Sequence, residues 1–96
     1  MKRWETTASL SDAFAPILDE PPSGDRLTAY DRQHLATYLR LLEAERAGAD
    51  PDHVARTVLR LDPVAAPEHA RRVHRSHLDR ARWMTTHGYR YFGLDS

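Results

Sequence analysis

The residue types near the start of one predicted helix suit contacts with nucleic acid. This helix is expected over residues 67–87, and its first turns carry a histidine and three arginines: His69, Arg71, Arg72 and Arg75. Arginine hydrogen-bonds guanine edges and binds phosphate, and recognition helices present such side chains near their start. We expect His69, Arg72 and Arg75 to lie away from the apolar stripe and read bases, while Arg71 contacts phosphate from the flank.

The residues alone leave a second interpretation open, in which the same face is only solvated. Arg72 lies four residues after Glu68, and Arg75 lies four residues before Asp79. Both spacings favour ion pairs along a helix surface. A DNA-reading face and a face of paired charges are therefore both compatible with the pattern.

The histidines and glycines give little support for a metal site or an active site. His74 and His77 lie three residues apart on one helix, but no neighbouring acid completes a ligand set and the His-Glu-x-x-His pattern is absent. The lack of cysteine excludes thiol catalysis, disulfides and Cys-containing zinc sites. The four glycines are widely separated and form no phosphate-binding loop. We expect no enzyme, no metal and no cofactor.

Length and charge narrow the class of protein further. A chain of 96 residues allows one small domain. Its formal net charge of zero argues against a general nucleic-acid coat protein, but residues 66–96 carry six basic and three acidic side chains, against two and five in residues 1–25. No apolar run approaches the roughly 20 residues that span a bilayer, and the start lacks a signal peptide's apolar stretch. We expect a cytoplasmic protein with no membrane contact.

Capping signals and helical spacing predict an all-α fold. The first helix starts at a capping box formed by Thr28 and Asp31 and runs to about Arg46. Its apolar stripe is expected to comprise Leu35, Tyr38, Leu39 and Leu42, with Leu41 to the side. The second helix starts at the N-cap Asp50 with Pro51 in its first turn, and it ends before the next proline. Its inner residues are expected to be Val54, Ala55, Val58 and Leu61.

The third helix, over 67–87, is predicted from Pro67 in its first turn and Gly88 after its end. Its inner stripe is expected to comprise Ala70, Val73, His77, Leu78, Ala81 and Met84, with His77 as a core residue that makes one hydrogen bond. A tight turn joins it to the second helix, as in a helix-turn-helix. The fold class is thus a small three-helix bundle with a helix-turn-helix core, closed by a short wing or an aromatic C-terminal tail of Tyr89, Tyr91 and Phe92.

Prolines predict how the chain divides. Pro16, Pro21, Pro22 and Gly24 prevent any long helix or strand before residue 26. We expect residues 1–26 to form a flexible acidic tail with a Pro-rich linker, and residues 27–96 to form the helix-turn-helix-like domain.

Three sequence runs resemble a known bacterial family: YDRQHL at 30–35, YLRLL at 38–42 and RARWMTTHGY at 80–89. The family is a helix-turn-helix-like domain of regulators on integrative and conjugative elements, and it includes the excision activator FseA and the antiactivator QseM. The resemblance covers roughly residues 27–92. It implies that a free-standing domain of this length is a transcriptional antiactivator, which binds FseA-like activators and the LuxR-type quorum-sensing regulator TraR and so represses excision and conjugative transfer.

The sequence contains more large side chains than a small core can hold. Those left outside the core would then anchor the partner. The residues expected to do so are Leu41, Leu59, Trp83, Tyr91 and Phe92. They would cover a surface that the activator needs for DNA binding or self-association.

The alternative is that the protein itself binds operator DNA. Helix 67–87 would serve as the recognition helix, in a dimer whose two-fold axis matches a palindrome. DNA is the second choice of partner on this reasoning, because zero net charge offers few phosphate contacts.

Overall fold

The structure, a computed structural model, describes residues 17–88. This part of the chain is helical and has no strand, which confirms the predicted small helical bundle. The elements are α2 (Ala29–Gln33), α3 (Leu35–Arg46), α4 (Pro51–Thr57), α5 (Pro67–Trp83) and the π-helical turn η2 (Met84–Gly88). The predicted wing or aromatic tail and residues 1–16 of the predicted acidic tail lie outside the described residues.

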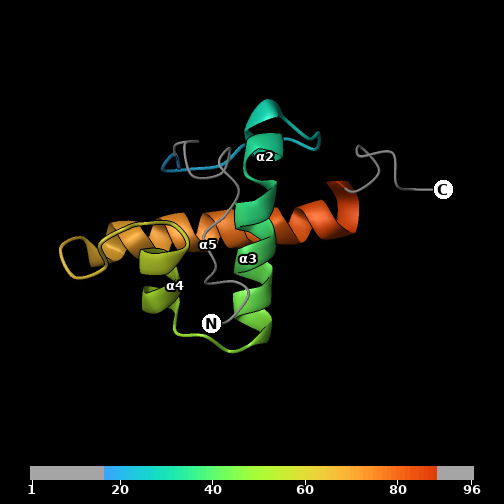
Figure 1. Ribbon diagram of the computed structural model, residues 1–96. Helices are drawn as coiled ribbons and strands as arrows, with labels where there is room; N and C mark the ends of the chain where they lie inside the picture. The colour runs from blue at the N-terminus through green and yellow to red at the C-terminus, as the bar shows by residue number, and fades with distance from the viewer. Residues whose placement is uncertain (1–16, 89–96) are drawn as a thin grey trace.

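The long helix α5 forms one side of the molecule, and both α3 and α4 cross it (Figure 1). The larger core cluster lies where the three helices meet and comprises Leu41, Ala44, Val54, Val58, Leu59, Val73 and Leu78. A second cluster lies toward the end of α5 and comprises Leu27, Tyr38, Ala81 and Met84. The inner stripe predicted for the third helix is confirmed, since all six of its residues are buried. No helix of the described chain is long and apolar enough to cross a membrane.

The predicted helix starts agree with the structure. The Thr28 hydroxyl accepts from the Asp31 backbone N–H, and the Asp31 carboxylate accepts from the Thr28 N–H, so the capping box is complete. The Asp50 carboxylate caps α4, and Pro51 takes the first helical position. These local signals work because they satisfy backbone N–H groups that no helical carbonyl reaches.

The connection from α4 to α5 differs from the predicted tight turn. Helix α4 ends at Thr57, and residues 58–66 separate it from α5. Arg60 adopts the left-handed conformation with φ 58°, and the Asp62 carboxylate accepts from the Val64 and Ala65 N–H groups, each at 3.0 Å. Sequence spacing predicted a longer α4 because the left-handed turn at a non-glycine residue carries no sequence signal.

The first predicted helix is divided in two, and its buried face is rotated from the expected one. His34 has φ −113° and ψ 23°, which interrupts the helix between α2 and α3. Leu39, expected in the stripe, is 52% exposed, whereas Leu41 is 1% exposed and part of the core. The buried face comprises Asp31, His34, Tyr38 and Leu41. Polar residues occupy its first turns, and apolar spacing alone does not identify them as buried.

One of these polar residues, Asp31, forms a buried ion pair with Arg80. The Arg80 Nε and Nη2 groups donate to the two Asp31 carboxylate oxygens at 3.0 and 2.7 Å. The Tyr38 hydroxyl also donates to this carboxylate, at 2.7 Å. The remaining Arg80 N–H groups donate to the backbone carbonyls of Gly24 (2.6 Å) and Arg26 (2.8 Å). One guanidinium therefore joins α5 to α2 and to the chain that precedes α2.

The hydrogen bonds determine how the carboxyl of Asp31 titrates. Burial alone raises its pKa, but the donors from Arg80, Thr28 and Tyr38 together outweigh burial and hold the pKa of Asp31 below its ordinary value. The same burial and the bond to Asp31 raise the pKa of Tyr38. Asp31 is therefore ionised and Tyr38 neutral throughout the physiological range.

Replacing Arg80 by Met should destabilise the fold strongly. The side chains of Arg80 and Asp31 are 5% and 0% exposed, so the variant leaves a charged carboxylate buried without its partner. Removing one member of a buried pair costs about 3–5 kcal/mol. Urea unfolding would measure the loss, with Arg82→Met as the control, since Arg82 pairs with Asp79 and Glu45 at the surface. Equal losses in the two variants would contradict the role given to Arg80.

The contribution of Asp31 should also vanish at low pH. A carboxyl whose pKa is lowered by folding stabilises the fold above its unfolded pKa of about 3.9, and this stabilisation is lost as pH falls through the folded pKa. The difference in unfolding free energy between the wild type and Asp31→Asn should therefore shrink below about pH 4. Asp25→Asn, at an exposed position, is the control and should change the unfolding free energy much less than Asp31→Asn. A constant difference for Asp31→Asn down to pH 2 would be inconsistent with this assignment.

Candidate nucleic-acid interface

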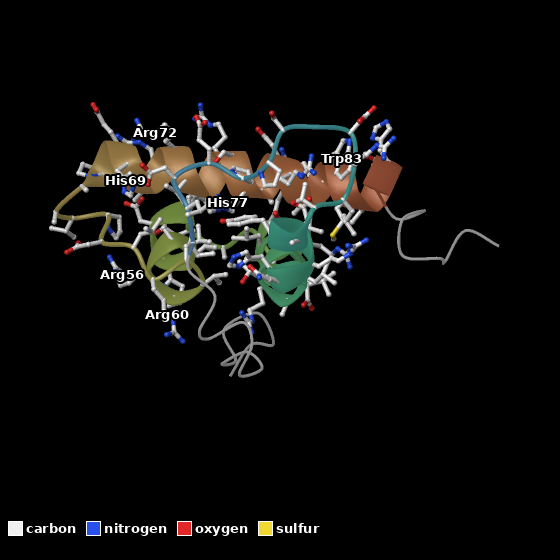
Figure 2. The ribbon with its side chains drawn as sticks, turned by 90° about the horizontal axis from the view of Figure 1, so that it is seen from above. Arg56, Arg60, His69, Arg72, His77 and Trp83 are labelled. Carbon is white, nitrogen blue, oxygen red and sulfur yellow. The ribbon has the colours of Figure 1, made fainter. Side chains whose placement is uncertain are left out.

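The face of α5 that points away from α3 and α4 is rich in arginine. Arg71, Arg72 and Arg75 are all exposed, whereas Val73 between them is buried. Figure 2 shows Arg72 on the side of α5 remote from Arg56 and Arg60. A shallow groove along this face is lined by Glu68, Arg71, Arg72, Arg75, Ser76 and Asp79. The structure therefore brings together the three arginines that the sequence singled out.

The two ion pairs that the sequence suggested for this face do not form within residues 17–88. Neither Arg72 with Glu68 nor Arg75 with Asp79 comes within ion-pair distance. Asp79 instead pairs with Arg82 at 3.1 Å, and Arg82 also binds Glu45 of α3. The charges at the end of α5 are thus compensated, and those of its first half are available to a ligand.

His69 lies beside the arginines but already has a partner. Its Nε2 lies 2.9 Å from the Asp19 carboxylate, which belongs to the chain before α2. The hydrogen bond from His69 and then its charge lower the pKa of Asp19. Burial opposes this shift, and the charge of Arg72 adds the weakest lowering effect. An anionic group is therefore held at the first turn of α5, where sequence analysis predicted base reading by His69.

The other two histidines of α5 serve the fold. His77 is fully buried, with Nδ1 2.8 Å from the Val73 carbonyl and Nε2 2.6 Å from the Tyr30 hydroxyl. The Val73 carbonyl can only accept, so Nδ1 carries the proton and Nε2 accepts from Tyr30. Burial lowers the pKa of His77, although the bond to Val73 opposes the shift. His77 is the core residue that was predicted, with two hydrogen bonds in place of one.

His74 is half-buried beside α4. Burial lowers its pKa, and the charge of Asp52 opposes the shift only in part. It adds no positive charge to the arginine face at neutral pH. Over residues 17–88, no three His, Asp or Glu side chains are grouped in a way that would hold a metal ion.

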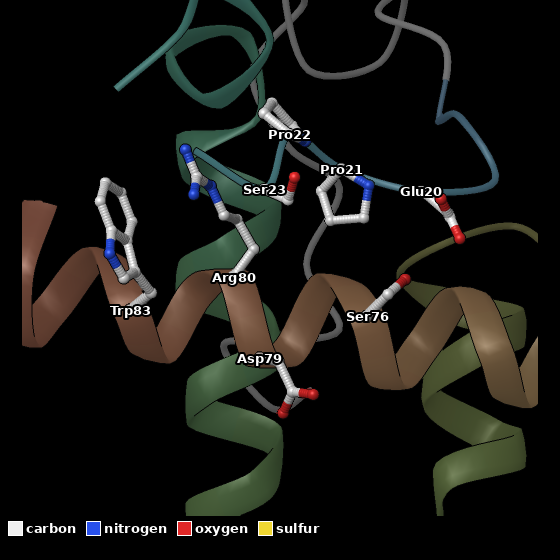
Figure 3. A pocket seen from close by; sticks show the side chains of 8 residues that line it. All are labelled: Glu20, Pro21, Pro22, Ser23, Ser76, Asp79, Arg80 and Trp83. Atoms are coloured by element: carbon white, nitrogen blue, oxygen red, sulfur yellow. The ribbon is translucent and has the colours of Figure 1, made fainter. Parts of the chain in front are cut away.

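Of the side chains expected to anchor a protein partner, those within residues 17–88 do not form an exposed surface. Leu41 and Leu59 are 1% and 2% exposed and belong to the core, so the expectation that they project outward is wrong. Trp83 is half-buried, and the Arg80 guanidinium lies 3.9 Å from the centre of its ring (Figure 3). Tyr91 and Phe92 lie outside the described residues. Core packing thus accounts for two of the five side chains, and a cation–π contact accounts for a third.

Sequence reasoning missed Arg80, whose guanidinium binds Asp31 and the carbonyls of Gly24 and Arg26. A signal for it was present, because Arg80 follows Val73 and His77 at the spacing of the buried stripe. A charged side chain at such a position requires a partner of opposite charge. The capping residue Asp31 supplies this partner from α2. Because Asp31 and Arg80 lie far apart in the sequence, helical spacing does not predict that they pair.

The described residues form a small helical bundle with three exposed arginines on one face of α5. A family model matches residues 1–92, and its description is "T6SS, Transcription factor, DNA binding domain". The chain belongs to this family, the RovC DNA-binding domain family. No curated protein matches the chain.

This family assignment corrects the resemblance drawn from the sequence. The match is to a DNA-binding domain and not to the domain family of FseA and QseM. The antiactivator interpretation loses its basis, together with the FseA-like and TraR-like partners, quorum sensing and the mobile element. The runs that suggested it contain Asp31, Tyr38, Arg80 and Met84, which are buried. They reflect a helical core, and a core does not identify a partner.

The arginine face should be dispensable for folding. Alanine at Arg71, Arg72 and Arg75 together removes exposed side chains that make no ion pair within residues 17–88, and alanine favours the helix. Each such surface change typically alters stability by no more than about 0.5 kcal/mol. Thermal unfolding followed by circular dichroism should give a midpoint near that of the wild type. A loss as large as that of Arg80→Met would show that these arginines are structural.

Proposed function

We propose that this domain binds DNA by placing the first half of α5 in the major groove. The observation that carries the proposal is the set of three exposed arginines on one face of α5, which lack ion-pair partners within residues 17–88, in a member of a DNA-binding family. Arg72 and Arg75 would read bases, and Arg71 would contact phosphate.

The dimensions of α5 support this placement. A helix with side chains is about 10–12 Å across, and the major groove is about 12 Å wide. The basic half of α5 is also its N-terminal half, where the helix dipole favours phosphate. In the other half, Arg82 is compensated by Asp79 and by Glu45 of α3, so this half offers less attraction to DNA.

The overall charge supports modest affinity from a single domain. Because the formal net charge is zero, acidic side chains offset much of the attraction of the basic side chains for phosphate. Specific binding then depends on base contacts, on a second copy of the domain or on further parts of a transcription factor. The family description makes the promoters of type VI secretion genes the first sequences to test.

Fluorescence anisotropy on a labelled generic duplex at about 50 mM salt tests the proposal, because generic duplexes report phosphate contacts without a known operator. On a generic duplex, which lacks the bases to be read, all three arginines would contact phosphate, and three such contacts predict a log–log salt slope of about −2.7, at about −0.9 per contact. Arg72→Ala with Arg75→Ala should reduce the slope to about −0.9 and weaken binding markedly.

The matched control is Arg32→Ala with Arg46→Ala, which removes the same charge from exposed positions on α2 and α3. It should weaken binding much less than the α5 variant. No binding by the wild type at tens of micromolar protein, or equal loss in the two double variants, would contradict the placement of α5.

A further inference from the structure

The chain before α2 lies across α5 as a strap, here defined as residues 17–26. Its prolines Pro21 and Pro22, with Ser23, lie over the middle of α5, and the Arg80 side chain rises from the helix to meet it (Figure 3). A groove of about 380 Å³ separates the strap from α5 and is lined by Glu20, Pro21, Pro22, Ser23, Ser76, Asp79, Arg80 and Trp83. The strap thus borders the helix proposed to enter DNA.

Packing and hydrogen bonds hold the strap at both ends. At its start, Ile17 packs against the core, and the Leu18 N–H donates to the Tyr30 hydroxyl at 3.0 Å. Tyr30 in turn donates to buried His77. At its end, Arg80 binds the carbonyls of Gly24 and Arg26. The acidic residues between these ends are therefore kept close to α5.

Asp19 lies in this fixed segment at the first turns of α5. Its Oδ1 is 2.9 Å from His69 Nε2. Arg72 is too distant from Asp19 for an ion pair, but its positive charge helps to lower the pKa of Asp19. Glu20, the next residue, is also exposed and faces the groove beside Ser76. A carboxylate among a histidine, an arginine and a helix start occupies the position that suits a phosphate oxygen of DNA.

We infer that Asp19 competes with the DNA backbone for His69 and Arg72 and thereby weakens binding to duplexes of any sequence. The inference rests on the proposed binding of DNA by α5. When DNA binds, a phosphate replaces the Asp19 carboxylate beside these two side chains, while the anchors at Leu18 and Gly24 stay in place. Because non-specific affinity is almost entirely electrostatic, the competition lowers it most and favours sites where bases are also read.

Asp19→Asn tests the inference, with Asp25→Asn as the matched control. Both variants remove one negative charge from an exposed residue of the strap, but only Asp19 contacts His69. Asp19→Asn should bind a generic duplex roughly two- to fivefold more tightly at about 50 mM salt, the range expected for releasing one exposed ion pair. The gain should shrink as salt rises, because salt screens the competing charge. Asp25→Asn should show a smaller gain.

The outcomes separate the two proposals. Duplex binding that both variants strengthen equally would overturn the role of Asp19 and leave DNA binding by α5 intact. Measurable binding by the wild type that Asp19→Asn strengthens more than Asp25→Asn would support both proposals. No binding by the wild type or by Asp19→Asn, with an unchanged unfolding midpoint, would overturn the proposed function and this inference with it.

Discussion

The arrangement of the described chain depends on one buried ion pair, between Asp31 and Arg80. Taking two charges out of water is costly, and the cost is offset only when every donor and acceptor finds a partner. Here the carboxylate also caps α2 and accepts from Tyr38, and the guanidinium also binds two carbonyls of the strap. These directional bonds fix α2, α5 and the strap relative to one another more tightly than apolar packing alone would.

The function proposed for α5 follows from this constraint. A helix that buries Val73, His77 and Arg80 on one side must turn Arg71, Arg72 and Arg75 toward solvent, because the two sets lie on opposite faces of the same helical turns. The strap that Arg80 anchors carries Asp19 to the edge of this basic face. The basic face proposed to attract DNA and the carboxylate proposed to compete with DNA therefore both depend on the burial of Arg80.

Local signals in the sequence predicted the helical fold, the capping residues Thr28 and Asp50 and the inner stripe of α5. They failed where distant residues decide the outcome. Apolar spacing favoured Leu39 over Leu41, because it gave no weight to Asp31 and His34 on the buried face. The three arginines of α5 could be selected from their spacing, but Asp79 pairs with Arg82 in place of Arg75, and Arg82 is held by Glu45, which only the folded chain brings near. The family resemblance failed because it rested on runs that the core explains.

The measurement that tests the central claim most directly is a nuclear magnetic resonance titration of the isotope-labelled protein with a generic duplex at low salt. Binding through α5 predicts the largest shifts at the side-chain Nε groups and backbone amides of Arg71, Arg72 and Arg75, with little change at Leu39 on the exposed side of α3. Shifts concentrated at Arg56 and Arg60, which lie on the other side of the molecule from Arg72 (Figure 2), would contradict the account.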